Sequence, residues 1–148
     1  MAATVCLVGE QGVGKSYIFN RLTRKSTSTS YCMSVKPSFA KYENNVVLYD
    51  LPGCKRFRQY NNLYLRKADA CIVVYNNTVE KERWKKEIYE ITRQQIPILF
   101  CTKSVKKRKV DIFLKDIHHQ TTISINLVDY LFGLVSVTNE VNHQCVIQ

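Results

Sequence analysis

Short runs of β-branched and aromatic residues alternate along the chain with stretches in which apolar residues recur at helical spacing. This alternation is typical of a parallel sheet covered by helices on both faces. The apolar runs predict strands at about 4–8, 37–42, 46–50, 71–75, 97–101 and 121–125. The helical patterns predict helices at about 15–24, 55–66, 79–94, 110–119 and 127–140.

The segment 41–46 predicts a tight hairpin, because the pair Asn44-Asn45 tolerates the left-handed backbone of short turns. The two strands that flank this turn are therefore expected to be antiparallel. Trp84, Ile88 and Ile91 recur at helical spacing and predict a helix face packed on the sheet. The predicted fold class is α/β, with a six-stranded, mostly parallel sheet that has one antiparallel strand and about five helices on both faces.

Length and composition favour one domain. The chain has 148 residues, of which 45% are hydrophobic, and this is enough for a single core. We expect a domain over 1–140 and a short tail over 141–148. No apolar run approaches the ~20 residues that span a bilayer, and the N-terminus lacks a secretion-signal pattern. These features predict a cytoplasmic protein.

The formal charge of +10 comes from 22 basic and 12 acidic residues. It makes phosphates, nucleic acid and anionic lipid all plausible partners. The densest basic cluster, at 103–109, predicts either a solvated loop or a nuclear-localisation or nucleic-acid patch. The solvated loop is the simpler interpretation, and no nucleic-acid partner is expected.

Candidate chemistry first appears at Gly9-Glu-Gln-Gly-Val-Gly-Lys-Ser16, which follows the apolar run 4–8. This Gly-x-x-x-x-Gly-Lys-Ser pattern between a strand and a helix predicts a phosphate-binding P-loop, and a chance glycine-rich turn is the alternative. Successive backbone N–H groups would surround the phosphates, Lys15 would reach the outer phosphates, and the Ser16 hydroxyl would hold a magnesium ion. The pattern therefore predicts binding of a nucleoside triphosphate.

A second candidate segment is Asp50-Leu-Pro-Gly53, which directly follows the apolar strand 46–50. Strand ends of an open α/β sheet converge on the ligand crevice. Asp50 can therefore approach the magnesium ion through water, and the Gly53 amide can bond the terminal phosphate. A plain surface turn is the alternative.

These segments resemble small GTPases of the Ras superfamily, Rab-like members especially. Asp50-Leu-Pro-Gly53 is similar to their second-switch motif, and Arg56-Phe-Arg58 to the start of their switch helix. The stretch Tyr64-Leu-Arg-Lys-Ala-Asp69 resembles their Tyr-x-Arg-x-Ala-Asp pattern, and Ile72-Val-Val-Tyr75 resembles the strand after it. The resemblance implies a P-loop small G-domain that binds GTP or GDP with Mg²⁺ and switches between two states.

The resemblance also implies a first-switch hydroxyl that closes over the ion. Ser34 lies where the family has its threonine, and Ser34-Val-Lys-Pro-Ser-Phe39 resembles the family's Thr-Ile-Gly-x-x-Phe. Thr29 is the reserve candidate, and an unspecialised polar loop is the alternative. The implied metal ligands are then Ser16, Ser34 and, through water, Asp50.

Base recognition departs from the family pattern. The family's Asn-Lys-x-Asp, whose Asp accepts from guanine, is replaced here by Thr102-Lys-Ser-Val105. Lys103 can still lie along the purine. Asp111 could supply a carboxylate in place of the missing Asp, but its spacing from the motif does not favour this role. Ser124-Ile-Asn126 resembles the family's last base-contacting loop, whose contact comes from a backbone N–H; a plain strand end is the alternative. The implied nucleotide-contacting residues are Gln11, Gly12, Val13, Gly14, Lys15, Ser16, Tyr17, Ser34, Gly53, Thr102, Lys103, Ser124 and Ile125.

Hydrolysis in this family relies on a Gln directly after the second-switch Gly. Cys54 occupies that place and cannot hold a water molecule as an amide does. The bulk of Gln11 crowds the terminal phosphate, and Pro52 restricts the hinge beside Gly53. We therefore expect weak GTPase activity, with Lys15, Gly53 and Cys54 at the catalytic positions. A non-catalytic pseudo-GTPase that serves as an interaction module is the alternative, and a P-loop kinase is disfavoured because no lid segment is recognisable.

The chain ends Cys145-Val-Ile-Gln148, a Cys-aliphatic-aliphatic-x pattern that predicts prenylation of Cys145, with farnesyl favoured by the terminal Gln. An ordinary frayed terminus is the alternative. One lipid needs a second signal, which the basic surface can supply on an anionic leaflet. The expected partners are effectors at the switch regions, an exchange factor, an activating protein, a prenyltransferase and an anionic membrane surface. The expected location is the cytosolic face of a membrane.

Overall fold

The computed structural model describes residues 2–23, 36–42, 45–128 and 143–144, and of 119–128 and 143–144 it describes the backbone only. The strands are β1 (Ala3–Gly9), β2 (Ser38–Tyr42), β3 (Val46–Asp50), β4 (Ala70–Val74), β5 (Ile98–Cys101) and β6 (His143–Gln144). The helices are α1 (Lys15–Leu22), the 3-10 turn η1 (Lys55–Phe57), α2 (Arg58–Leu65), α3 (Thr78–Thr92) and α4 (Lys107–Val128).

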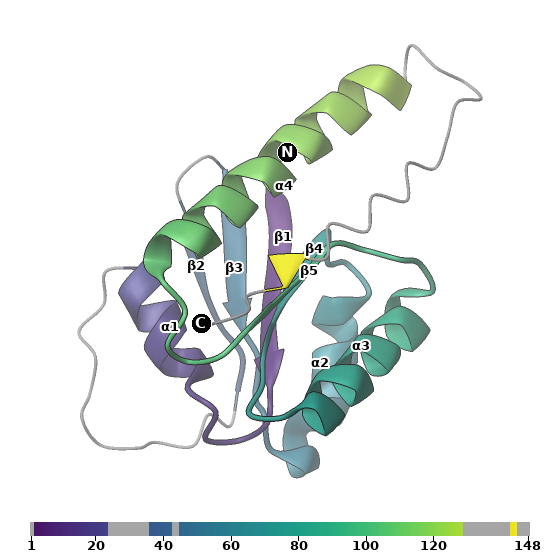
Figure 1. Cartoon of the computed structure of the whole chain (residues 1–148). Coiled ribbons are helices and arrows are strands. Elements are labelled where there is room, and N and C mark those ends of the chain that lie inside the picture. Colours follow the sequence, from purple (N-terminus) through teal and green to yellow (C-terminus); the bar gives the residue numbers. More distant parts are fainter. Residues whose placement is uncertain (1, 24–35, 43–44, 129–142, 145–148) are drawn as a thin grey trace.

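The described strands form one six-stranded sheet in the order β2-β3-β1-β4-β5-β6 (Figure 1). β2 runs antiparallel to β3, and the other neighbouring pairs are parallel. The predicted hairpin is confirmed: Asn45 has a φ of 63° in the turn that precedes β3. The predicted class, an α/β fold with a single antiparallel strand, is confirmed as well.

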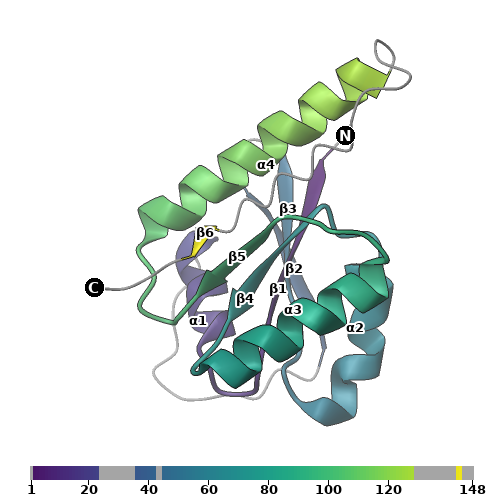
Figure 2. The same cartoon turned by 45° about the vertical axis from the view of Figure 1, so that its right-hand side comes forward.

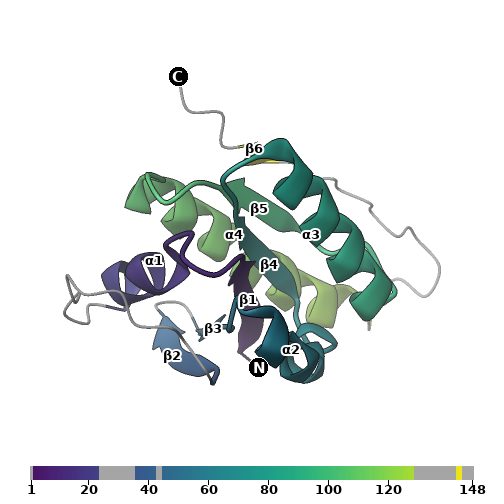
Figure 3. The same cartoon turned by 90° about the horizontal axis from the view of Figure 1, so that it is seen from below.

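Helices cover both faces of the sheet, as the alternation of apolar runs and helical patterns predicted (Figure 3). Leu7 of β1 belongs to a core with side chains of α1 and α4, including Phe113. The next residue, Val8, belongs to a second core with side chains of α2 and α3, including Trp84. Because successive strand side chains point to opposite faces, β1 serves both cores and is buried along most of its length.

Helix α3 shows how local sequence defines an element. The Asn77 side chain caps it by accepting a hydrogen bond from Glu80 N at 2.9 Å, and Glu80 in turn accepts one from Asn76 N at 2.9 Å. Trp84 and Ile88 face the sheet and are buried, as their spacing predicted. The helix ends at Arg93, which has a left-handed φ of 55°.

The chain after β5 differs from the prediction. The strand expected at 121–125 is wrong, because these residues continue α4, a single helix from Lys107 to Val128. A short apolar, β-branched run cannot be distinguished from a helical segment by its periodicity, and extending an existing helix is far easier than starting a new element. Of the helix expected at 127–140, the first two residues belong to α4 and the rest lie outside the described residues.

The sixth strand is instead β6, whose residues His143 and Gln144 pair in parallel with Leu99 and Phe100 of β5 (Figure 2). β6 lies within the segment predicted as a tail. The last turns of α4 extend beyond the sheet (Figures 1 and 2). Within the described segments, no helix combines the length and the hydropathy that crossing a bilayer demands.

Candidate functional site

The predicted P-loop connects β1 to α1 at the carboxyl end of the central strand. Val13 anchors the loop in the core with 2% of its surface exposed. Gly14 precedes α1 with a φ of 101°, a conformation that favours glycine. No side chain of the described residues caps the first turn of α1. The positive end of this helix is therefore available to an anion, as the loop sequence predicted.

Lys15 lies buried at the start of α1. Its Nζ donates a hydrogen bond to the carbonyl of Glu10 at 2.8 Å. Burial is the main reason that the pKa of Lys15 is lowered to about 8; the charge of Asp50 opposes this shift, and the charge of Arg58 adds a smaller lowering. The amine is thus a buried cation whose charge is poorly compensated, which suits it to bind a phosphate oxygen.

Ser16 and Asp50 meet across the site. The Ser16 hydroxyl donates to Asp50 Oδ2 at 2.7 Å. Burial raises the pKa of Asp50, while the Ser16 hydrogen bond and the charge of Lys15 oppose that rise. Asp50 Oδ1 is buried and has no hydrogen-bond partner among the described residues. A hydroxyl beside a buried carboxylate with a spare oxygen is an oxygen donor set that fits Mg²⁺.

Gly53 lies in close contact with the P-loop. A Cβ at this position would lie 2.5 Å from both the carbonyl oxygen of Gly9 and Nζ of Lys15. Only glycine fits here without displacing the loop or the lysine. The predicted site residues Lys15, Ser16, Asp50 and Gly53 are therefore brought together.

An ion cluster beside the P-loop was not predicted from the sequence. Glu10 pairs with both Arg58 of α2 and Arg83 of α3. The Arg58 guanidinium lies 4.9 Å from the centroid of the Trp84 ring, and its Nε donates to the Gly53 carbonyl at 3.2 Å. The sequence signal that could have revealed this cluster is Glu10 itself. A carboxylate inside an anion-binding loop requires basic partners nearby.

The loop after β5 lies beside the P-loop. A Cβ at Gly14 would lie 2.7 Å from Cβ of Lys103, so the Lys103 side chain runs along the phosphate-binding loop. Thr102 and Ser104 share a hydrogen bond of 2.9 Å between their hydroxyls. Lys103 thus lies beside the P-loop, and its contact with a purine stays a prediction, while Val105 is 6% exposed and belongs to the core.

Two other base-contact expectations do not fit the structure. Ser124 and Ile125 lie within α4 and not in a loop at a strand end, so the loop predicted for them is absent at that position. Asp111, considered as a compensating carboxylate, accepts a hydrogen bond from the Tyr42 hydroxyl of β2. The base end of the site is thus less complete than the phosphate end.

The other residues predicted to contact nucleotide, metal or lipid are not part of the Lys15, Ser16, Asp50 and Gly53 cluster. Gln11 and Gly12 are exposed on the P-loop. Tyr17 is 47% exposed, and the Arg21 guanidinium lies 5.6 Å from the centroid of its ring. Cys54 is half-buried with an extended backbone next to Gly53. Ser34, its reserve Thr29 and Cys145 lie outside the described residues.

Comparison with known proteins agrees with this geometry. The family model described as Roc, the Ras of Complex domain of DAPkinase, matches residues 4–105. The match runs from β1 to the loop after β5, and so includes the P-loop, Asp50 and Gly53. The chain belongs to the Ras superfamily of small GTPases and is Rab-like.

Among curated relatives of this small GTPase, the Ras-related protein Rab-7B of Dictyostelium discoideum is 35% identical over 108 residues, which are 65% of this chain and 52% of the relative. Human Ras-related protein Rab-22A is 33% identical over 96 residues, 57% of this chain and 50% of the relative. The mouse Ras and EF-hand domain-containing protein homolog is 30% identical over 122 residues, 74% of this chain and 20% of the relative. The chain spans about half the length of the Rab relatives it matches.

Proposed function

We propose that this small GTPase binds GTP and GDP with Mg²⁺ and acts as a nucleotide-dependent switch in membrane trafficking or signalling. The observation that carries the proposal is the hydrogen bond between Ser16 and Asp50, with the buried Lys15 amine and Gly53 beside it. In this arrangement Lys15 would bind the outer phosphates, Ser16 and Asp50 would hold the ion, and the Gly53 amide would bond the terminal phosphate. The ion would offset phosphate charge and link Ser16 and Asp50 to the nucleotide. Ser34 is the proposed additional ligand.

Nucleotide affinity measured with and without Mg²⁺ tests this assignment. We expect Mg²⁺ to strengthen GTP binding to the wild type, and Asp50→Asn to lose most of this strengthening while keeping the affinity measured in chelator. The matched control is Asp116→Asn, which removes the same charge from an exposed position of α4. Equal Mg²⁺ dependence in wild type and Asp50→Asn would refute the role of Asp50.

The proposed hydrolysis is slow. Cys54 follows Gly53 at the position that must orient the attacking water, and a thiol is a weak donor and acceptor. We expect Cys54→Gln to hydrolyse GTP faster than wild type in a single-turnover assay, and Cys54→Ser, which keeps the small side chain, not to do so. A wild-type rate equal to that of Cys54→Gln would show that Cys54 does not limit hydrolysis.

The proposed effector surface lies next to the phosphate site. Phe39 of β2, Tyr49 of β3 and Tyr64 of α2 form a continuous aromatic row, with ring centroids 5.8 and 5.2 Å apart. Phe39 of β2 and Leu63 of α2 are 68% and 64% exposed and are therefore accessible to a partner protein. Because only Cys54 and the turn η1 separate Gly53 from α2, the bound nucleotide can alter this surface. Hydrogen exchange in β2 and α2 should differ between the GDP-bound and GTP-analogue-bound protein, and identical exchange would argue against a switch.

Attachment to the cytosolic face of a membrane is proposed from the sequence of the last four residues. A prenyltransferase would modify Cys145, and the basic surface would add attraction to anionic lipid. Incubation with a farnesyl donor and the transferase should label wild type and not Cys145→Ser. Equal labelling, or equal membrane fractions of the two in cells, would refute lipid attachment. An exchange factor and an activating protein are the proposed regulators.

A second candidate function is a pseudo-GTPase that serves as a fixed interaction module. The structural observation in its favour is that Lys15 Nζ already donates a hydrogen bond within the protein, to the Glu10 carbonyl. Calorimetry separates the candidates: absence of submillimolar binding of GTP, GDP and ATP would support the module and refute the switch.

A further inference from the structure

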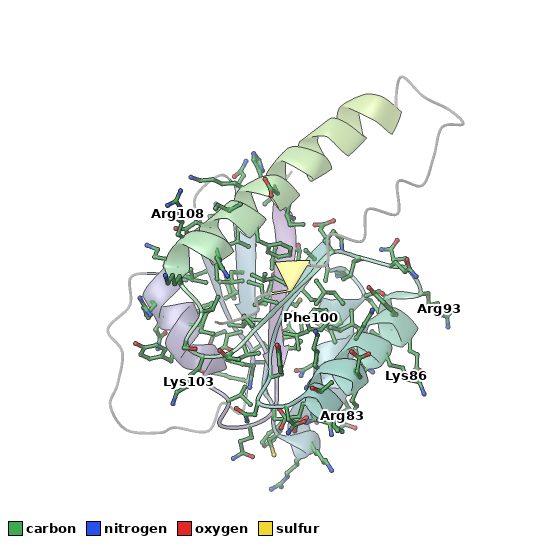
Figure 4. The ribbon with its side chains drawn as sticks, viewed as in Figure 1. Arg83, Lys86, Arg93, Phe100, Lys103 and Arg108 are labelled. Carbon is green, nitrogen blue, oxygen red and sulfur yellow. The ribbon has the colours of Figure 1, made fainter. Side chains whose placement is uncertain are left out.

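The loop that follows β5 lies beside the P-loop. It comprises residues 102–106, between Cys101 and the start of α4, and Lys103 lies at the carboxyl end of the strand that contains Phe100 (Figure 4). The Lys103 side chain is exposed and runs along Gly14 of the P-loop. Together with the resemblance of Thr102-Lys-Ser-Val105 to the family's base-contacting motif, this places the base of a nucleotide bound at the P-loop against this loop.

To distinguish guanine from adenine, a protein needs groups that can only donate or only accept a hydrogen bond. Guanine presents an N1–H, an amino group and a carbonyl oxygen on its Watson–Crick edge, whereas adenine presents an acceptor nitrogen and an amino group. A carboxylate accepts only, and therefore favours guanine strongly. Residues 102–106 contain no carboxylate and no side-chain amide.

The side chain that ends the turn is directed into the core. The Val105 N–H donates to the Thr102 carbonyl at 3.0 Å, which closes the turn. Val105 itself packs in the core with Val13 and Val110. Besides the exposed amines of Lys103 and Lys106, the turn leaves the hydroxyls of Thr102 and Ser104 outside the core, and these bond each other with either atom able to donate. A hydroxyl rotates to donate or accept as its partner requires, so this pair can serve either purine.

We propose that the site takes purine nucleoside triphosphates without distinguishing guanine from adenine. The phosphate groups supply most of the affinity through the P-loop, and the base is held by its face along the Lys103 stem. This inference rests on the proposed nucleotide binding and names its ligand class: Mg²⁺ complexes of GTP and of ATP alike.

Calorimetry on the nucleotide-free full chain tests the inference with Mg·GTP, Mg·ATP and Mg·tripolyphosphate. We expect the dissociation constants of GTP and ATP to agree within about threefold, and tripolyphosphate to bind more weakly than both. A preference for GTP of about 30-fold or more would overturn the inference and leave the proposed switch intact. If neither nucleotide binds, the proposed function fails and this inference fails with it.

Variants give a second readout. Lys103→Ala should weaken GTP and ATP binding by the same factor, because it removes a contact with the purine face. Arg108→Ala, which removes a charge from an exposed site on the outer side of α4, should change neither (Figure 4). Thr102→Val should also leave the GTP to ATP ratio unchanged. A loss confined to GTP in either Lys103→Ala or Thr102→Val would show base-specific recognition and overturn the inference.

Discussion

The guanidinium of Arg58, in the first turn of α2, pairs with the carboxylate of Glu10 in the P-loop. The same guanidinium donates to the Gly53 carbonyl at 3.2 Å. One side chain thus joins the two segments that would contact the terminal phosphate. These two contacts of Arg58 therefore stabilise the position of Gly53 next to Lys15.

Replacement of Arg58 should destabilise the fold. Arg58→Ala removes a charge-assisted hydrogen bond to a largely buried carboxylate, and we expect the free energy of unfolding to fall by about 2 kcal/mol. Urea denaturation of the nucleotide-free protein measures the change. Arg56→Ala is the matched control, because Arg56 is exposed on η1 and its described contact is with the neighbouring Phe57 ring. A similar loss of stability in both variants would show that the Glu10 pair contributes little.

Gly53→Ala should separate phosphate binding from folding. The new Cβ would lie 2.5 Å from Lys15 Nζ, so the lysine or the loop must move. We expect Mg·GTP affinity to fall by about tenfold or more while circular dichroism of the nucleotide-free protein stays unchanged. Lys55→Ala, at an exposed position nearby, should keep wild-type affinity. An affinity of Gly53→Ala within about twofold of wild type would contradict the close approach.

The parts of the site that lie in one short segment could be predicted from the sequence. The P-loop, the Asp50 strand end and the Asn45 turn each follow from the conformational demands of a few neighbouring residues. The Rab-like resemblance added the family and the place of Lys103. None of these required knowledge of how distant helices pack.

The features of the fold and the site that could not be predicted from the sequence depend on contacts between segments far apart in the chain. Glu10 and Arg58 are 48 residues apart, and nothing local indicates that the loop and the helix meet. Residues 121–125 have the composition of a strand, but they continue a helix that begins at Lys107 and is held by core residues such as Phe113. The inward side chain of Val105 likewise follows from packing with α4, which the sequence alone did not place.

The lowered pKa of Lys15 predicts opposite pH responses of binding and folding. The free protein loses the Lys15 proton with a pKa of about 8, against an ordinary value of 10.5. A bound polyphosphate stabilises the charged amine, so nucleotide affinity should be constant below pH 8 and fall by up to about tenfold per pH unit above it. The unfolded chain binds more protons than the folded one between these two values, so the Lys15 contribution to nucleotide-free stability should rise with pH in that window.

Lys15→Arg is the control for this pH dependence, because its guanidinium stays charged throughout. Binding titrations and urea melts of both proteins from pH 7 to pH 9.5 would measure the difference. A nucleotide affinity that does not change with pH over this range, in wild type as in Lys15→Arg, would show that Lys15 does not lose its proton there.

Val105 occupies the position where the family has its guanine-contacting carboxylate. Because this side chain packs in the core and is 6% exposed, Val105→Asp should place a carboxylate among apolar groups and not at the base. We expect a loss of stability of about 3 kcal/mol and no gain in guanine preference. Ser104→Asp introduces the same charge at the exposed neighbouring position and should leave the stability within about 0.5 kcal/mol of wild type. A Val105→Asp protein with wild-type stability and a new preference for GTP over ATP would show that residue 105 faces the base.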